Sequence, residues 1–464
     1  MSAIYQQLAA LLLPQEILSE PAGLLTDQRR RYTGTADLVL QPQSVEAVKT
    51  IMRFCFEHRI PVTPQGGNTG LCGAAVPRGG VLLNLSRLNR IRSISTADNA
   101  ITVEAGCVLH DVQQAAEGAG RFFPLSLASE GSCQIGGNIA CNAGGLNVLR
   151  YGTMRDLVMG LEVVLPNGEL VSHLHPLHKD TTGYDLRQLF VGSEGTLGII
   201  TAATLKVYPQ PAARLTAWAA VPSMQAAVNL LGLAQKRLSA GLTGFEVMNQ
   251  FALSLVDKHH PQLRTPLWRD SPWCVLLENS DYESEDHARA LFERLLEEAL
   301  EAGCVSDAVV AESMAQAKNL WHIRESIPLA QADEGLNIKH DISVPISRIP
   351  AFVEATDALL QAEIAGVRLV NFGHLGDGNL HYNVQAPEGG DPKEFLRTQE
   401  ARINHIVYDS VQAHGGSISA EHGIGSLKAE ELPRYKSPVA LQTMRAIKAA
   451  LDPLGLMNPG RVLG

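Results

Sequence analysis

Short apolar runs alternate with helical periodicities through the first part of the chain. Residues 35–40 are predicted to form a strand, Ser44 to cap the helix that follows, and residues 61–63 to begin the next strand. Glycine-rich stretches interrupt this alternation at three places. The pattern therefore predicts a domain within residues 1–211, with its core at about residues 34–210, in which glycine-rich loops connect helices and strands.

From residue 212 to 416 the pattern changes to strands alternating with longer helices. Residues 273–277 read as a strand, and residues 284–301 place apolar side chains at helical spacing. We expect an α+β domain with an antiparallel sheet and helices on one face. Residues 417–464, with a predicted helix at 439–451, form a third segment.

Two histidines flank a predicted turn in the second domain. Residues 367–372 and 380–384 read as strands, and Asp377-Gly378 between them is typical of a tight hairpin. Counting outward from this turn, His374 faces His381, with Cβ atoms about 5 Å apart. Such a pair can share a metal ion, and a coincidental histidine pair in a surface hairpin is an equal alternative.

A second stretch, residues 417–425, alternates apolar and polar residues and contains Glu421 and His422. Glu421 could complete a site of two histidines and one carboxylate, a set that leaves positions open for substrate and suits Zn²⁺, Mn²⁺ or Fe²⁺. His422 would then be a general base beside the metal. The plainer alternative is that Glu421 caps the turn that follows it.

Composition narrows the classes of partner. The 464 residues contain 38 Lys and Arg against 48 Asp and Glu, a formal charge of -10. This balance argues against nucleic acid or an anionic membrane as the main partner, although a few local cations can still hold an anionic substrate. Seven scattered cysteines without a Cys-x-x-Cys pair favour a reducing, cytoplasmic location. No apolar run approaches the roughly 18 residues of a transmembrane helix.

The three glycine-rich loops share one character. They lie at residues 64–73, 132–145 and 191–200 and offer exposed main-chain N–H groups, which suit phosphate binding. The sequence has no Gly-x-Gly-x-x-Gly fingerprint and no Gly-Lys-Ser/Thr, so neither a Rossmann nicotinamide site nor a P-loop is supported. We expect the three loops to converge on one long ligand.

The order of these loops, with Pro42 before them and Asn458-Pro459-Gly460 near the end, resembles the FAD-linked oxidases of the vanillyl-alcohol oxidase and p-cresol methylhydroxylase fold. Within that group, residues 374–381, 419–423 and 336–341 resemble the D-2-hydroxyglutarate dehydrogenase branch, near the D-lactate and glycolate dehydrogenases. The match covers nearly the whole chain. It implies a two-part FAD-binding domain, an antiparallel-sheet substrate cap and a C-terminal segment that returns to the flavin domain.

The resemblance implies FAD as cofactor. No histidine lies in the three loops, so we expect FAD to be bound without a covalent link. Its contacts are expected from the three loops and the segments beside them, namely Pro64, Gln65, Gly66, Gly67, Asn68, Thr69, Gly70, Leu71, Gly73, Ser132, Gly136, Gly137, Asn138, Asn142, Gly144, Gly145, Tyr151, Gly152, Glu194, Gly195, Gly198, Ile199, Ile200 and Asn458.

The resemblance also implies the chemistry: an oxidoreductase in which a D-2-hydroxy acid, D-2-hydroxyglutarate first, becomes the 2-oxo acid as hydride passes to flavin N5. His374, His381 and Glu421 match the family's metal ligands, with zinc expected and manganese or cobalt as alternatives. His422 matches the catalytic base. A metal there would lower the pKa of the substrate hydroxyl.

Three further residues match positions that bind the substrate in this family: Arg324, Lys339 and Asn383. Pro328 departs from the pattern, because some members carry a hydroxyl side chain there and proline cannot donate a hydrogen bond. Without the resemblance, Arg324 beside Glu325 would be interpreted as a solvated surface pair. Lys339 within an apolar strand would be costly to bury without a function.

Other candidates have structural interpretations. His173, His175 and His178 follow a strand and are expected to decorate a surface loop. Cys72, Cys133 and Cys141 are interpreted as small packing residues near the flavin loops.

Rival functions remain at this stage. The same chemistry on D-lactate or glycolate is the nearest rival, followed by a flavin-dependent transferase of the alkylglycerone-phosphate synthase type and a non-catalytic flavin carrier. Electron-transfer flavoprotein or a quinone is expected as electron acceptor by analogy with the family. A homodimer is compatible with the sequence.

Overall fold

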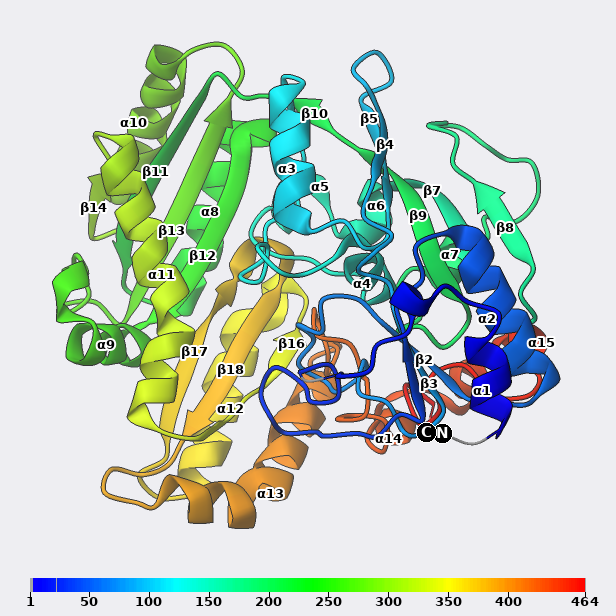
Figure 1. Cartoon of the computed structure of the whole chain (residues 1–464). Coiled ribbons are helices and arrows are strands. Elements are labelled where there is room, and N and C mark those ends of the chain that lie inside the picture. The colour runs from blue at the N-terminus through cyan, green and yellow to red at the C-terminus, as the bar shows by residue number, and fades with distance from the viewer. Residues whose placement is uncertain (1–2, 22, 464) are drawn as a thin grey trace. The chain divides into compact units, whose positions relative to one another are not determined.

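The computed structural model describes residues 3–21 and 23–463. The chain divides into two compact units (Figure 1). Unit 1 comprises residues 1–145, 151–210 and 421–464, and unit 2 comprises residues 146–150 and 211–420. The chain therefore leaves unit 1 for unit 2 twice, and its last segment belongs to unit 1.

Unit 1 contains two main sheets and a short two-stranded one. A parallel three-stranded sheet has the order β1-β3-β2, an antiparallel five-stranded sheet has the order β4-β5-β9-β7-β8, and β6 pairs with β10. The strands are β1 (Leu38–Leu40), β2 (Val62–Gln65), β3 (Val81–Asn84), β4 (Ile91–Ser95), β5 (Ala100–Glu104), β6 (Arg121–Phe122), β7 (Val158–Val164), β8 (Leu170–His173), β9 (Ile199–Lys206) and β10 (Tyr208–Pro209). The helices are α1 (Ala3–Ala9), α2 (Val45–Glu57), α3 (Leu109–Gly118), α4 (Ile135–Ala140), α6 (Met154–Leu157), α7 (Arg187–Phe190), α14 (Leu432–Tyr435) and α15 (Pro438–Leu451), with α5 (Val148–Tyr151) at the unit boundary.

The predicted helix after Ser44 is confirmed as α2. The Ser44 side chain accepts a hydrogen bond from the main-chain N–H of Ala47 at 3.1 Å, which satisfies one of the otherwise unpaired N–H groups of the first turn. Its buried residues, such as Val48, Ile51 and Cys55, recur at helical spacing and join the core of unit 1.

Unit 2 is built on one antiparallel sheet with the strand order β14-β11-β13-β12-β17-β18-β15, to which β16 adds by pairing with β18. Its strands are β11 (Ala213–Val221), β12 (Leu242–Asn249), β13 (Trp273–Asp281), β14 (Asp307–Val310), β15 (Asn337–Ile338), β16 (Asp341–Ser343), β17 (Arg368–His374) and β18 (Asn379–Gln385). Its helices are α8 (Met224–Leu238), α9 (Gln250–His259), α10 (Glu285–Glu301), α11 (Met314–Glu334), α12 (Ile349–Glu363) and α13 (Pro392–Ala413).

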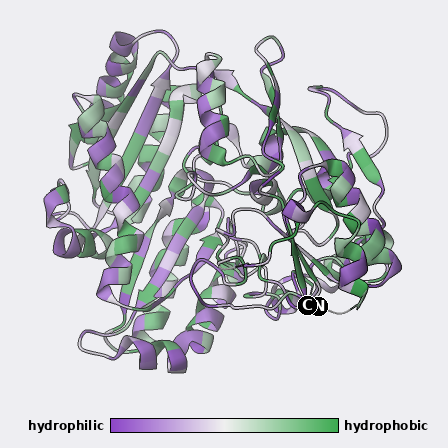
Figure 2. Ribbon diagram, in the orientation of Figure 1, coloured by the Kyte–Doolittle hydropathy of each residue, from purple (hydrophilic) through white to green (hydrophobic). Residues whose placement is uncertain are grey.

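Helices cover both faces of this sheet, so the prediction of helices on one face is wrong. Trp218, Met248 and Leu276 pack with residues of α9 and α11 in one core cluster, while α8 and α10 contact the same strands. Strands β11 and β12 are buried at nearly every position, which requires cover on both sides. The amphipathic pattern of α10 is confirmed, since hydrophilic and hydrophobic residues alternate along it (Figure 2).

The hairpin between β17 and β18 differs from the predicted register. His381 pairs with Phe372, and not with His374, which pairs instead with Glu246 of β12. The difference arises because a short 3-10 turn, Leu375–Asp377, lengthens the loop beyond two residues and ends at Gly378 with φ +86°. His374 is thereby the last residue of β17.

The structure adds two observations on membranes and thiols. Among the described residues, no helix is both long and apolar enough to cross a bilayer. The seven cysteines are free thiols, and all except the partly buried Cys141 are buried.

The N-cap of α2 gives a test of the fold. We expect Ser44→Ala to lower the free energy of unfolding by about 1 kcal/mol, because the N–H of Ala47 loses its partner. Chemical denaturation of the full chain measures this change. Thr50→Ala on the same helix removes only an exposed hydroxyl bonded to a main-chain carbonyl and serves as control. An equal effect of both changes would contradict the capping role.

Candidate functional site

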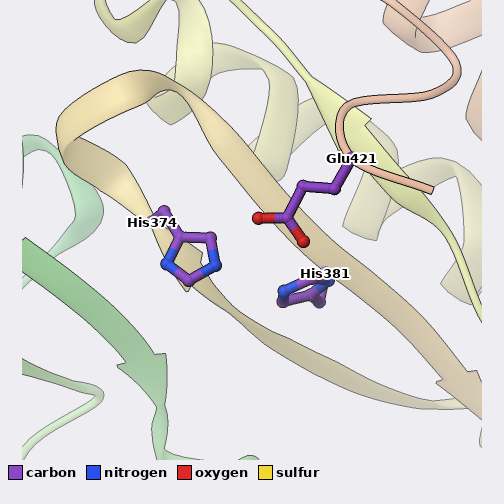
Figure 3. Close-up of side chains that lie close together, drawn as sticks. All are labelled: His374, His381 and Glu421. Carbon is purple, nitrogen blue, oxygen red and sulfur yellow. The ribbon is translucent and has the colours of Figure 1, made fainter. Parts of the chain in front are cut away.

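His374, His381 and Glu421 gather into one cluster, as the sequence predicted. Each offers a ligand atom, and these atoms lie within 4.8 Å of one another. The two imidazole rings are 5.6 Å apart between centroids at an interplanar angle of 77°, and the carboxylate of Glu421 points towards both (Figure 3). Two imidazoles and a carboxylate are a typical donor set for catalytic zinc.

The position of Glu421 follows from the residues just before it. Ser417 and Ser343 exchange main-chain hydrogen bonds of 2.8 and 3.0 Å, and the N–H of Ala420 donates to the carbonyl of Asp341 at 3.2 Å. The segment therefore runs along β16 at the edge of the sheet. Because Glu421 is covalently joined to Ala420, this pairing brings its carboxylate to the histidines of β17 and β18.

A second group shares Glu421. Asp341, Glu421 and His422 also offer ligand atoms within 4.8 Å of one another. Asp341 is buried, and its Oδ1 accepts a hydrogen bond from Nδ2 of Asn379 at 3.0 Å. Asp341 was not among the predicted site residues, although it lies two positions after Lys339 in the same motif. His422 thus has the carboxylates of Asp341 and Glu421 in its neighbourhood.

Glu246 of β12 is the residue that the sequence analysis missed. Its Oε1 accepts a hydrogen bond from Nδ1 of His374 at 2.6 Å, and its Oε2 accepts from Nε of Arg324 at 2.8 Å. Burial alone would raise the pKa of the Glu246 carboxyl, but the charges and hydrogen bonds of His374 and Arg324 together lower it to about 2. The sequence does contain a signal for a buried ion pair here, namely a single carboxylate in the otherwise apolar run 245–248. Burying an unpaired charge is costly, so such a residue indicates a charged partner.

This contact fixes the tautomer of His374. A carboxylate only accepts hydrogen bonds, so Nδ1 carries the proton and Nε2 remains as the metal-binding nitrogen. A metal-ligating histidine commonly donates its other ring N–H to a carboxylate, which fixes the orientation of the ring and increases the basicity of the ligand nitrogen.

Arg324 lies inside unit 2, so its interpretation as a solvated surface pair is wrong. It is 5% exposed, pairs with Glu246 and stacks over the ring of Phe372 at 4.9 Å. It stands on α11, which contains Pro328 in its interior. Pro328 has no N–H, so the carbonyl of Arg324, four residues earlier, lacks its usual helical hydrogen bond.

The other two candidates for substrate binding differ in exposure. Lys339 is exposed between β15 and β16, so the expectation of a buried lysine in an apolar strand is wrong. Asn383 is 3% exposed, accepts a hydrogen bond from the N–H of His340 and donates one to Gln331. Contact of these residues with a substrate stays a prediction.

The three glycine-rich loops lie against one another in unit 1. A Cβ added at Gly67 would lie 2.1 Å from the carbonyl oxygen of Ser132, and one at Gly195 would lie 2.3 Å from Cγ of Pro64. The first loop thus approaches both of the others more closely than any side chain would allow.

The geometry of these loops fits a cofactor held by main-chain groups. Asn68, Asn142, Glu194 and Asn458 adopt left-handed φ values between 45° and 53°, a conformation that is uncommon outside glycine and concentrates at ligand sites. A Cβ at Gly137 would meet no atom within 4 Å. Nearby, the buried Oε1 of Gln134 has no hydrogen-bond partner within the described part of the chain. An open main-chain surface and an unsatisfied acceptor match the needs of a nucleotide.

Two of the predicted flavin contacts have side chains that bind the protein itself. Both carboxylate oxygens of Glu194 accept main-chain hydrogen bonds from residues 424 and 425. Nδ2 of Asn458 donates to the carbonyls of Ala74 and Glu194. Any contact of these two residues with FAD would therefore involve their remaining atoms.

His173 is the last residue of β8 and not part of the predicted loop, whereas His175 and His178 follow the strand as expected. His173 pairs with Asp180 at 3.1 Å and packs edge-on against His175, and His178 is exposed. They do not belong to either group of candidate metal ligands found among the described residues.

The contact between Glu246 and Arg324 gives a second test. We expect Glu246→Gln to lower the free energy of unfolding by about 3–5 kcal/mol, because it leaves the guanidinium buried without a counter-charge. Glu104→Gln is the matched control: this carboxylate is equally buried, but the side chains of its partners Arg90 and Arg92 are 74% and 27% exposed, and Arg92 keeps a second partner in Glu162. We expect a smaller loss there in chemical denaturation, and an equal loss would refute the explanation.

Two protein-family models match the chain. The C-terminal domain of FAD linked oxidases matches residues 210–462, and the FAD binding domain matches residues 36–173. Together they support FAD as cofactor and span most of both units.

Solved structures confirm the fold class. The chain is similar to p-cresol methylhydroxylase with substrate bound, at a TM-score of 0.77 and 18% identity over 99% of this chain and 96% of that one. It is also similar to alkyldihydroxyacetonephosphate synthase, at a TM-score of 0.71 and 17% identity over 98% of this chain and 84% of that one. At these identities the likeness concerns the fold alone.

Closer relatives are enzymes of one name. The chain is 37% identical over 466 residues to D-2-hydroxyglutarate dehydrogenase of Stutzerimonas stutzeri, covering 99% of this chain and 98% of the relative. It is 40% identical to that of Xanthomonas citri pv. viticola, covering 96% and 93%, and 38% identical to the mitochondrial enzyme of Arabidopsis thaliana, covering 94% and 77%. The chain belongs to the D-2-hydroxyglutarate dehydrogenase family of FAD-linked oxidases.

Proposed function

We propose that the protein is an FAD- and metal-dependent dehydrogenase that oxidises D-2-hydroxyglutarate to 2-oxoglutarate. The observation that carries the proposal is the cluster of His374, His381 and Glu421 beside His422, in a chain with an FAD-binding domain and relatives of that name. When bound, FAD supplies the acceptor for the hydride from the substrate's C2. The three glycine-rich loops hold it through main-chain groups and without a covalent link.

The cluster would hold one divalent ion. Two imidazoles and one carboxylate favour zinc, with manganese or cobalt as alternatives, and leave coordination positions for a hydroxyl and a carboxylate oxygen. A bound ion would supply a Lewis acid that lowers the pKa of the substrate hydroxyl. Glu246 supports this assignment, because it orients His374 with Nε2 as the ligand nitrogen.

His422 takes the hydroxyl proton. It follows Glu421 directly, so a substrate hydroxyl placed at the cluster lies within reach of its imidazole. The carboxylates of Asp341 and Glu421 lie beside this imidazole. Removal of the proton as hydride leaves C2 produces the 2-oxo acid.

The substrate carboxylates would be held by Arg324 and Lys339, with Asn383 as a polar contact. Lys339 is exposed, and its ammonium group would be accessible to the distal carboxylate of a diacid. Arg324 is stiffer, because Glu246 and the Phe372 ring fix its guanidinium. It suits the carboxylate next to C2, where orientation matters most.

A smaller substrate, D-lactate or glycolate, is the second candidate. The specific observation in its favour is that Glu246 already neutralises the charge of Arg324, while Pro328 brings no hydroxyl to the same helix. A diacid would then depend mainly on Lys339 for its second carboxylate. We retain the diacid as first substrate because the relatives carry its name.

The setting of the enzyme forms part of the proposal. Seven free thiols support a reducing, cytoplasmic location. Electron-transfer flavoprotein or a quinone is proposed as the electron acceptor by analogy with the family.

Anaerobic bleaching of the flavin tests substrate and metal together. We expect D-2-hydroxyglutarate to bleach the FAD-loaded protein rapidly, and D-lactate, glycolate and D-malate to do so more slowly. Chelation should abolish bleaching, and Zn²⁺ or Mn²⁺ should restore it. Bleaching by D-lactate and glycolate alone would favour the second candidate, a dehydrogenase of these smaller substrates. No bleaching by any hydroxy acid would refute a dehydrogenase and favour a transferase.

Replacement of His422 tests the base. We expect His422→Asn to slow anaerobic flavin reduction by about 10²–10⁴-fold, because the hydroxyl proton loses its acceptor. The zinc content should stay unchanged, since His422 is not a proposed ligand. The exposed His178→Asn provides the control and should reduce flavin at the normal rate. Normal reduction by the His422 variant would remove it from the mechanism.

A further inference from the structure

Glu194 joins three segments of unit 1 through its main chain. It lies in the third glycine-rich loop with φ +50°. Its N–H donates to the carbonyl of Ala140 in the second loop at 2.8 Å, and its carbonyl accepts from Nδ2 of Asn458 at 2.8 Å. This left-handed conformation is uncommon outside glycine, so a strained residue is retained at a junction.

The carboxylate of Glu194 binds a fourth segment. Oε1 accepts the N–H of Ile424 and Oε2 accepts the N–H of Gly425, each at 2.7 Å. The side chain is almost inaccessible, since the residue is 8% exposed. Two short hydrogen bonds to adjacent main-chain N–H groups match the two oxygens of one ionised carboxylate.

The bound segment has no room to move towards Glu194. Gly423 has φ +78°, and a Cβ there would lie 2.7 Å from Oε1 of Glu194. Gly425 has φ +53°, and a Cβ there would lie 2.3 Å from the carbonyl oxygen of Cys72. Both glycines are needed for the main chain to approach this closely.

The first glycine-rich loop holds the same segment from another side. The carbonyl of Cys72 accepts the N–H groups of Ser426 and Leu427 at 2.8 and 3.2 Å, and its thiol donates to the carbonyl of Gly423 at 3.3 Å. Residues 423–427 are therefore tied to the first and third loops. Glu421 and His422 come directly before this anchored stretch.

A buried carboxylate is a costly way to bind two N–H groups. Burial raises the pKa of the Glu194 carboxyl, against which the two main-chain hydrogen bonds and the charges of Lys428 and Arg461 act. The desolvation cost is offset only while those bonds are made, so the carboxylate and residues 424–425 hold each other in a single arrangement.

We propose that Glu194 is a positioning residue that fixes Glu421 and His422 by clamping the main chain of residues 423–425 to the glycine-rich loops. The inference rests on the proposed function for the roles of Glu421 and His422. It adds a direct mechanical link between the loops that would hold FAD and the segment that supplies a metal ligand and the base. Ordering of the loops then orders that segment as well.

Glu194→Gln tests this link, with Glu16→Gln as matched control. Gln retains one acceptor oxygen but turns an NH₂ group towards the second N–H. Glu16 is also buried in unit 1, and its two oxygens accept the N–H groups of Leu13 and Gln43 at 3.0 and 2.9 Å, away from the glycine-rich loops. If breaking such a pair of hydrogen bonds simply lowers the stability of unit 1, the loss of stability therefore appears in both variants.

Two readouts on the FAD-loaded full chain separate positioning from general stability. In hydrogen–deuterium exchange, the peptide covering residues 421–427 should exchange at least about tenfold faster in Glu194→Gln and at the wild-type rate in Glu16→Gln. Zinc affinity, measured by competition with a chelator, should fall by about 10–100-fold in the first variant only. Unchanged exchange and zinc affinity in Glu194→Gln would overturn the proposal.

A second pair of variants disturbs the clamp from the opposite side. Gly423→Ala forces a Cβ against the Glu194 carboxylate, while Gly455→Ala has a similar φ of +66° and meets no atom within 4 Å. Only the first should loosen the peptide 421–427 and weaken zinc binding. Equal behaviour of the two would count against the clamp, even if Glu194→Gln fails to fold.

The experiment also separates this inference from the proposed function. If wild-type protein binds no zinc, the metal assignment of Glu421 fails. The exchange comparison between Glu194→Gln and Glu16→Gln still decides whether Glu194 fixes the segment.

Discussion

The buried carboxylate of Glu246 is the constraint on which the arrangement of unit 2 depends. It lies within a sheet strand that is buried at nearly every position, so its charge must be compensated inside the protein. Arg324 supplies the compensating charge and His374 the remaining hydrogen bond. This requirement favours the pairing of Glu246 with His374 across β12 and β17, and with it the orientation of one imidazole of the candidate metal site.

In unit 1, the constraint on the arrangement is the close approach of main-chain segments to one another. The glycine-rich loops meet at distances that exclude side chains, and non-glycine residues in left-handed conformations turn their polar groups across the junctions. Glu194 illustrates the result, because it bonds the second loop, the C-terminal turn and the segment after His422 at once. The glycine-rich loops and the segment after His422 thus share one network of hydrogen bonds.

The cation set bears on substrate choice. Arg324 is buried, neutralised and held in one orientation, whereas Lys339 is exposed between two short strands. In the proposed function, the fixed guanidinium of Arg324 would bind the carboxylate beside the reacting carbon, and the exposed ammonium of Lys339 would bind the distal carboxylate. Pro328 adds no donor to this set, so under the proposed function the discrimination between a diacid and a small monoacid would depend on few groups.

Much of the local structure follows from the sequence alone. The helix after Ser44, the amphipathic helix that ends at Glu301 and the two strands around His374 and His381 were predicted from periodicity and capping, which act over a few residues. The family resemblance added the fold class, which the comparisons with solved structures bear out. It also added the metal site, whose three proposed ligands lie close together while the metal itself stays a prediction.

What the tertiary structure decided depends on contacts between distant residues. The cover on both faces of the large sheet, the two-residue shift in the hairpin and the burial of Arg324 could not be read locally, because each results from packing against other strands and helices. Glu246 and Glu194 have partners 78 to 231 positions away, and no local pattern specifies which N–H or guanidinium a buried carboxylate will meet. The sequence by itself determined the elements and the residue types of the site, and the tertiary structure decided which buried charges hold them in place.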